Sequence, residues 1–234
     1  MKILILAATH GNELLGPKLI EYMLRKHPSL FEYIEFIVAN PRALAKRIRY
    51  TESDLNRSYG LGTDTYEQRR ANDIEAHIKA TQPDIVLDMH TTACVQPPIM
   101  IVGNITNATV RAYLRNCHIS TVLQVKPLHD IATITPSIVA YEIMNRDVTT
   151  NVLEQICEDL NKFLNNKVEK KVINLYRMSD KIYKRDITAA QAKTFKNFEM
   201  NELGFIPIMT GNNSYKKQTD YLGFKSAEPI DLVL

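Results

Sequence analysis

The chain has 234 residues, of which 45% are apolar and 24% charged, so it is ordinary for a globular protein and suits one domain with a small appendage. Its net charge of +3 is too small to indicate a nucleic-acid-binding surface, and no stretch approaches the roughly 18 apolar residues that a membrane span needs. Three cysteines without C-x-x-C spacing argue against a disulfide framework and a thiolate zinc site, and they favour a cytoplasmic protein.

Strand-like and helix-like segments alternate along the first two thirds of the chain. The continuous apolar run of residues 3–8 predicts a buried strand, and Leu15, Leu19 and Met23 then recur at helical spacing. Further strands are expected over residues 33–39, 84–89, 98–102, 120–125 and 138–143, and further helices over residues 65–81 and 152–164. This alternation predicts an α/β fold with a central, mostly parallel mixed sheet and helices on both faces.

The pattern changes after Asn166, where short apolar pieces are interrupted by Asn and Gly turns such as residues 211–213. Such a pattern is typical of short strands joined by turns. We therefore expect residues 1–166 to be followed by a small β-rich C-terminal region of residues 167–234.

The first candidate motif, His10-Gly11-Asn12-Glu13, lies between the first expected strand and the first helix. In open α/β sheets, ligands bind beyond the carboxyl ends of the strands. An imidazole and a carboxylate three residues apart in a turn can reach one ion, and both suit zinc. Gly11 would let the backbone bend sharply between them. The alternative, for this motif alone, is a loop histidine beside a glutamate at a helix N-terminus.

A second buried strand delivers another histidine, in Asp88-Met89-His90. If the two strands are parallel, His90 lies at the same sheet edge as His10. Two histidines and one carboxylate leave an open position for water, which is the pattern of catalytic rather than structural zinc. The two motifs together predict a metal site of His10, Glu13 and His90, against the alternative that His90 is hydrogen-bonded at a strand–loop junction.

An arginine-rich, loop-like stretch follows the second expected strand. The planar guanidinium of Arg49 matches carboxylates and developing oxyanions. Asp54 either orients a ligand histidine or pairs with a nearby arginine. We interpret Arg42 and Arg47 as surface residues.

Glu142 ends an apolar strand, where a carboxylate is unfavourable unless it is paired or solvated. A zinc hydrolase needs a base that takes a proton from the attacking water and returns it to the leaving nitrogen. Glu142 is the candidate, and the alternative is a strand-end glutamate in a salt bridge.

These motifs, in this order, resemble those of the aspartoacylase/succinylglutamate desuccinylase family, a branch of the zinc carboxypeptidase-like fold. The resemblance runs over H-G-N-E, N-P-R-A, R-Y-x-x-x-D-L-N-R, Y-E-x-R-R-A, D-x-H-T-T and the later strand glutamate. It is clear over about residues 1–165 and weak beyond. It implies a zinc hydrolase catalytic domain over residues 1–166 and a C-terminal region that contributes to the active-site cleft.

The resemblance also implies a metal and a chemistry. His10, Glu13 and His90 match the zinc ligands of the family, which implies one Zn²⁺ per chain. Arg49 matches the arginine that polarises the scissile carbonyl and stabilises the oxyanion. Glu142 matches the general acid/base.

The substrate-binding residues that the resemblance implies are Asn56 and Arg57, which match a pair that grips a substrate carboxylate, and Tyr215, which matches a C-terminal tyrosine that reaches into the site. Aspartoacylases have a further arginine and tyrosine before the catalytic glutamate, and the corresponding residues 129–136 contain neither. The resemblance therefore leaves the acyl group and the amino acid unspecified.

The expected function is that of a zinc-dependent deacylase that hydrolyses the amide bond of a small N-acyl amino acid, with no nucleic-acid or membrane partner and with a homo-oligomer left open. One alternative is a zinc carboxypeptidase or peptide amidase that accepts a larger substrate. The other is a binding module that kept the fold and lost catalysis, against which the presence of Glu142 and Arg49 argues.

Overall fold

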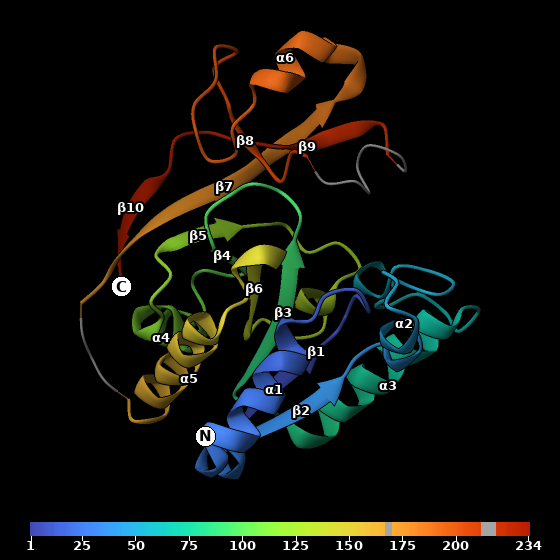
Figure 1. The fold of residues 1–234 in the computed structure, drawn as a ribbon, viewed down its shortest axis with the longest axis vertical. Helices are drawn as coiled ribbons and strands as arrows, with labels where there is room; N and C mark the ends of the chain where they lie inside the picture. Colours follow the sequence, from blue (N-terminus) through green and yellow to red (C-terminus); the bar gives the residue numbers. More distant parts are fainter. Residues whose placement is uncertain (167–169, 212–218) are drawn as a thin grey trace.

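A mixed β-sheet runs through the whole molecule (Figure 1). The computed structural model describes residues 1–166, 170–211 and 219–234, so the predicted site residue Tyr215 lies outside the described residues. The strands are β1 (Ile3–Ala7), β2 (Ile34–Val38), β3 (Ile85–Thr92), β4 (Ile99–Val102), β5 (Thr121–Gln124), β6 (Ile138–Met144), β7 (Val172–Tyr183), β8 (Ile206–Ile208), β9 (Tyr221–Ser226) and β10 (Ile230–Val233). Their order across the sheet is β2-β1-β3-β6-β4-β5-β7-β9-β8, and β10 pairs with β7.

The first four strands in this order, β2, β1, β3 and β6, are parallel, whereas β4 runs antiparallel to β6. Beyond β4, the strands β5 and β7 are again parallel neighbours. The mostly parallel mixed sheet predicted from the sequence is confirmed. Because β1, β3 and β6 are parallel, their carboxyl ends meet at one edge of the sheet.

Helices cover both faces of the sheet, as predicted (Figure 1). They are α1 (Leu15–Lys26), α2 (Pro41–Lys46), α3 (Tyr66–Thr81), α4 (Ala108–Asn116), α5 (Thr150–Leu164) and α6 (Ala189–Thr194). Alternate residues of β1 point to opposite faces: Ile3 and Ile5 pack in the core beneath α1, α4 and α5, while Leu4 and Leu6 pack in the core beneath α3. This two-sided burial explains why β1 is continuously apolar.

Three of the helices were not predicted from the sequence. The helix α2 lies in the stretch interpreted as a loop, where Asn40 caps it by accepting a hydrogen bond from the Ala43 amide at 3.1 Å. The helices α4 and α6 also lie in segments for which no helix was predicted. Both α2 and α6 have six residues, too few to show a clear helical periodicity.

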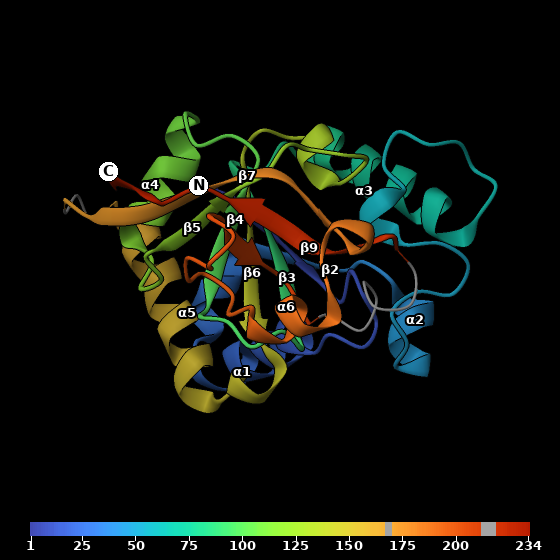
Figure 2. The ribbon, with the colours of Figure 1, turned by 90° about the horizontal axis from the view of Figure 1, so that it is seen from above.

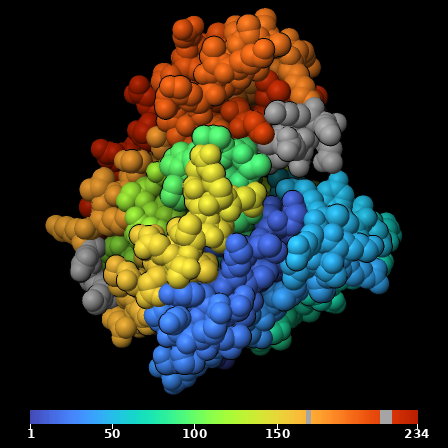
Figure 3. All heavy atoms as spheres, viewed as in Figure 1, coloured from blue at the N-terminus to red at the C-terminus, as the bar shows by residue number. Residues whose placement is uncertain are grey.

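The C-terminal strands extend the sheet and lie above the carboxyl ends of β3 and β6 (Figures 1 and 2). The long strand β7 pairs with β5 and β10 near its start and with β9 near its end, and β8 pairs with β9. Figure 3 shows these residues as one end of the molecule, against the segment that follows β3. A division of the chain at residue 166 stays a prediction.

Two further features of the described residues bear on the sequence-based expectations. None of the described helices combines the length and the apolar character that crossing a membrane requires. The cysteines Cys94, Cys117 and Cys157 are buried and form no disulfide, as their spacing predicts.

Candidate metal centre and active site

The segment between β1 and α1 places His10 and Glu13 at the carboxyl edge of the sheet. Ala8, directly after β1, has a φ of 55°, a conformation that is unfavourable for a residue with a side chain and that turns the chain sharply before His10. The chain turns between His10 and Glu13, where the Glu13 amide donates to the His10 carbonyl at 3.0 Å, and Gly11 has no positive φ in this turn. A Cβ atom on Gly11 would instead overlap the backbone of Ala43, so glycine is needed for close approach to α2.

His90 comes from β3, whose eight residues are all buried. The strand pairs in parallel with both β1 and β6, so it delivers His90 to the edge where His10 lies, as the sequence predicts. Asp88, two residues earlier, shares a face of the strand with His90.

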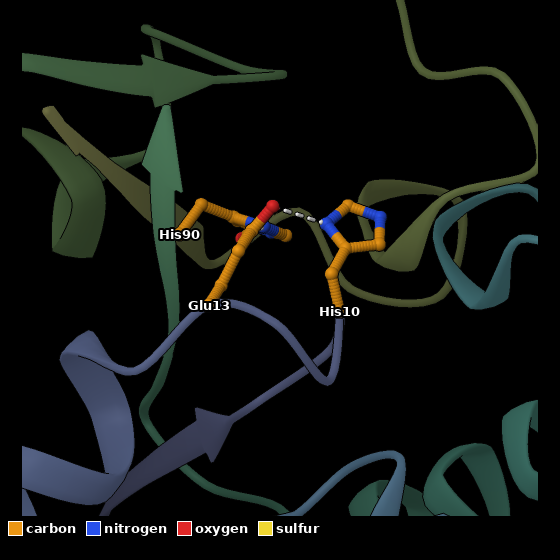
Figure 4. Close-up of side chains that lie close together, drawn as sticks. All are labelled: His10, Glu13 and His90. Atoms are coloured by element: carbon orange, nitrogen blue, oxygen red, sulfur yellow. Dashed lines mark hydrogen bonds and ion pairs between the residues drawn. The ribbon is translucent and has the colours of Figure 1, made fainter. Parts of the chain in front are cut away.

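The three predicted ligands converge on one point (Figure 4). His10 Nδ1 lies 2.8 Å from Glu13 Oε1, and His90 Nδ1 lies 2.9 Å from Glu13 Oε2. Each residue offers one ligand atom, and these three atoms lie within 4.8 Å of one another. The exposed fractions of His10, Glu13 and His90 are 3%, 6% and 5%. This compact, buried group of two imidazole nitrogens and one carboxylate oxygen has the size and chemistry of a divalent transition-metal site.

The remaining ring nitrogen of each histidine faces another carboxylate. His10 Nε2 lies 3.1 Å from Asp54 Oδ1, and His90 Nε2 lies 2.8 Å from Asp88 Oδ2. With a metal ion bound, these acceptors would hold the imidazole proton on Nε2, and the Nδ1 lone pairs would be directed at the shared point. The residues therefore fit a zinc ion, with two neutral imidazoles and one carboxylate as donors and a position left for water.

The electrostatics of the site favour a positive charge at this point. Burial lowers the pKa of His90, but the carboxylates of Asp88 and Glu13 outweigh burial and raise that pKa well above 6.5. The pKa of His10 is raised in the same way, against burial, by Glu13 and Asp54. The pKa of Glu13 is held well below its usual range, because the two histidines outweigh the effect of its burial. A field that favours imidazolium also favours a metal cation.

Arg49 lies beside the predicted metal ligands and is oriented by Asp54. Its Nε and Nη2 atoms donate to Asp54 Oδ2 at 3.2 and 3.0 Å, and its Nη1 lies 3.7 Å from Glu13 Oε1. Asp54 therefore makes both of the contacts that the sequence left open, one with His10, a predicted metal ligand, and one with an arginine. Burial opposes its ionisation, but His10 and Arg49 outweigh burial and hold the pKa of Asp54 far below its usual range.

Glu142 lies on the strand next to that of His90, one of the predicted metal ligands. In the parallel pairing of β3 and β6, Glu142 is the partner of His90. Burial, together with the negative charge of Glu13, raises the pKa of Glu142 to about 7. A carboxyl group of this pKa can accept and return a proton near neutral pH.

A cavity of about 360 Å³ opens onto these groups. Seven of the predicted site residues line it: His10, Glu13, Arg49, Asn56, Arg57, His90 and Glu142. Its opposite wall comes from the C-terminal strands and includes Met178, Lys181, Met209, Tyr221 and Phe224. The structure thus brings the predicted residues to one cavity, while their individual roles stay predictions.

Sequence reasoning assigned no role to Asp88 or Thr9. Asp88 Oδ1 accepts a hydrogen bond of 2.6 Å from the Thr9 hydroxyl, while its other oxygen faces His90. Thr9 therefore holds the carboxylate that faces His90, a predicted metal ligand. The available signal was the D-x-H spacing within a predicted strand, since residues two apart share a face.

Residues 1–142 match the family model described as succinylglutamate desuccinylase/aspartoacylase catalytic domain. A probable aspartoacylase of Prochlorococcus marinus (strain MIT 9515) is 39% identical over 101 residues, which cover 39% of this chain and 34% of the relative. An N-acyl-aromatic-L-amino acid amidohydrolase (carboxylate-forming) of Xenopus tropicalis is 32% identical over 104 residues, with the same coverages. The matches thus span about a third of the length of these curated relatives.

The fold is shared with solved structures over nearly the whole chain. The crystal structure of murine aminoacylase 3 superposes with a TM-score of 0.75 at 19% identity, over 100% of this chain and 96% of that one. Succinylglutamate desuccinylase from Chromobacterium violaceum gives a TM-score of 0.76 at 18% identity, over 99% and 85% of the two chains. At these identities the similarity establishes the fold, which extends through the C-terminal strands.

Proposed function

The chain belongs to the succinylglutamate desuccinylase/aspartoacylase family, and on that premise we propose that it is a zinc-dependent hydrolase of the amide bond in small N-acyl amino acids. The observation that carries this proposal is the convergence of His10, Glu13 and His90, with Arg49 and Glu142 on the same cavity. A bare metal site would lack these last two groups. Hydrolysis of an amide needs both a proton carrier and a charge that stabilises the oxyanion.

Zinc bound at the three ligands would act as a Lewis acid on the scissile carbonyl and lower the pKa of a water molecule in its open position. Glu142 takes a proton from the attacking water as the new C–O bond forms at the amide carbon. The C–N bond then breaks, and Glu142 returns the proton to the leaving nitrogen. The products are a carboxylic acid and an amino acid.

Arg49 stabilises the negative charge that develops on the carbonyl oxygen. Its guanidinium is oriented by two hydrogen bonds to Asp54, so little reorganisation is needed when the charge appears. One contact to a developing oxyanion is worth about 3–4 kcal/mol. Asn56 and Arg57 hold a carboxylate of the amino-acid part, because both line the same cavity as Arg49.

The C-terminal wall of the cavity favours a second class of substrate. Met178, Met209 and Phe224 give this wall an apolar surface, which suits an aromatic or aliphatic group. The relative from Xenopus tropicalis carries the name of an N-acyl-aromatic-L-amino acid amidohydrolase. N-acyl aromatic amino acids are therefore our second candidate, besides acidic ones such as N-acetyl-aspartate.

A panel of substrates tests the proposal. Zinc-loaded protein is assayed for release of free amino acid from N-acetyl-L-aspartate, N-succinyl-L-glutamate, N-acetyl-L-phenylalanine and a small dipeptide series. We expect hydrolysis of at least one N-acyl amino acid, with dipeptides cleaved much more slowly. Preferred cleavage of dipeptides would favour a carboxypeptidase, and absence of any turnover with zinc bound would favour a binding module.

A further inference from the structure

Two of the sequence motifs, N-P-R-A and Y-E-x-R-R-A, contain no residue of the proposed chemistry. The structure joins them through Glu67 in the first turn of α3. Glu67 has an exposed fraction of 0%, although burial of a carboxylate is unfavourable unless it is hydrogen-bonded or paired. Its surroundings must therefore compensate for its burial.

The Glu67 carboxylate accepts five hydrogen bonds, and four of them come from residues 51–53. Oε1 accepts from the Thr51 amide at 2.7 Å, the Thr51 hydroxyl at 2.6 Å and the Asn40 side chain at 3.2 Å. Oε2 accepts from the amides of Glu52 and Ser53, both at 3.1 Å. Three consecutive backbone amides are thus gathered around one buried side chain, which fixes the path of that loop.

Side chains of the loop also contact the start of α3. Glu52 Oε2 accepts a hydrogen bond of 2.7 Å from the Tyr66 amide, and the hydroxyls of Ser53 and Thr65 lie 2.7 Å apart. Arg70, one turn further along α3, donates to the Ala39 carbonyl at 3.1 Å. Residues 51–53 and the start of α3 are therefore joined from both sides, while Arg70 joins α3 to the residue that follows β2.

The segment held in this way carries the substrate-facing residues. Arg49 lies two residues before the first amide bound by Glu67, and Asp54 directly follows the last one. Asp54 in turn contacts His10 and Arg49. Displacements of about 1 Å in such groups can lower a rate by about 100-fold, so the position of this loop decides how well they work.

We propose that Glu67 is a positioning residue that holds residues 49–57 in the geometry required by Arg49, Asn56 and Arg57. This inference rests on the proposed function for the roles of those three residues. Glu67 itself does not line the cavity, so it acts through the loop and not on the substrate.

The geometry requires a carboxylate and not merely a side chain of this shape. All five partners of Glu67 are donors, and an amide in its place would turn an NH₂ group toward either two or three of them. Burial raises the pKa of Glu67, but the hydrogen bonds from Thr51, Ser53 and Asn40 outweigh burial and lower it below 4.5. Glu67→Gln is therefore the sharpest test, since it keeps the volume and replaces one of the two acceptor oxygens with a donor.

The experiment compares Glu67→Gln with Glu75→Gln in the full chain. Glu75 lies on the same helix and pairs with Lys79 on the surface, so its loss is a matched control. Steady-state kinetics use the best substrate of the panel and the same compound with each carboxylate in turn converted to an amide. Hydrogen exchange is measured at the amides of residues 51–53.

For Glu67→Gln we expect kcat/KM to fall by about 100-fold with a raised KM, a smaller preference for carboxylate over amide substrates, and faster exchange at residues 51–53. Glu75→Gln should match the wild type in all three. Mere loss of folded protein would instead lower kcat equally for every substrate and leave KM unchanged, and that result would overturn the inference. The inference would also be overturned if the amides of residues 51–53 exchanged at the same rate in Glu67→Gln as in the wild type.

A milder variant keeps the test decisive if Glu67→Gln does not fold. Thr51→Val removes only the hydroxyl donor and should shift KM and exchange in the same direction by a smaller factor. Unchanged KM and exchange would contradict the inference. If the wild type hydrolyses no substrate of the panel, the proposed function fails, while the exchange comparison still decides whether Glu67 holds the loop.

Discussion

The two walls of the active-site cavity are built differently. The wall at the sheet edge consists of charged groups that fix one another: Glu13 contacts both histidines, and Asp54 joins His10 to Arg49. The opposite wall, from β7 to β9, is largely apolar and includes Met178 and Phe224. We infer that the first wall carries the reacting groups, whose positions tolerate little displacement. The second wall contacts the apolar part of the substrate, and its residues determine which substrates fit.

The largest expected effect is at Glu142, on the chemical wall. Glu142→Gln keeps the shape of the side chain but removes the proton acceptor, so kcat should fall by about 10³-fold with KM changed little. Steady-state kinetics on zinc-loaded protein measure this effect, with the exposed Glu158→Gln as the control. Full turnover in Glu142→Gln would contradict the assignment of the proton acceptor to the sheet-edge wall.

The same substitution should raise stability in metal-free protein. The pKa of Glu142 is raised from about 4.5 when unfolded to about 7 when folded, so the ionised group destabilises the fold as pH rises through this interval. Below pH 4.5 the wild type and Glu142→Gln should be equally stable, and above pH 7 the variant should be more stable by roughly 3 kcal/mol. Urea unfolding at pH 4.5 and pH 8 measures the difference. A variant that is less stable than the wild type at pH 8 contradicts the assigned environment of Glu142.

The smallest effect is expected on the apolar wall. Met178→Ala enlarges the cavity away from the reacting atoms, so it should change the preference between N-acetyl-phenylalanine and N-acetyl-aspartate by about tenfold. The kcat for the smaller substrate should stay within about threefold of the wild type, because the groups of the chemical wall are untouched. Met200→Ala, at a residue that is 47% exposed, is the control. A loss of kcat as large as that in Glu142→Gln would remove the distinction between the walls.

The sequence predicts the sheet-edge wall well, because its signals are local. Apolar runs over residues 3–8 and 85–87 identify β1 and the start of β3, and His10 and His90 come two and three residues after these runs. The partnership of Glu142 with His90 follows from strand pairing, which periodicity alone does not determine. The positioning contacts of Glu67 were not predicted, because they join residues 14 to 27 positions apart through loop amides that carry no sequence signature.

The C-terminal wall is much harder to predict. Its residues come from β7, β9 and the segment near Met209, and β7 shifts register twice where it pairs with β9. Such irregular pairing leaves no clean alternation in the sequence. The sequence could therefore indicate a β-rich region but not which of its side chains face the cavity. Tyr215 lies outside the described residues, so the role predicted for it stays a prediction.

The metal content of the protein tests the central claim most directly. After reconstitution with zinc and removal of excess metal, elemental analysis should give one zinc per chain for the wild type. His90→Ala and Glu13→Gln should each lose most of this zinc, because each removes one of the three converging ligands. A wild-type protein that retains no stoichiometric zinc, or variants that retain it fully, would contradict the assignment of His10, Glu13 and His90 as the metal site.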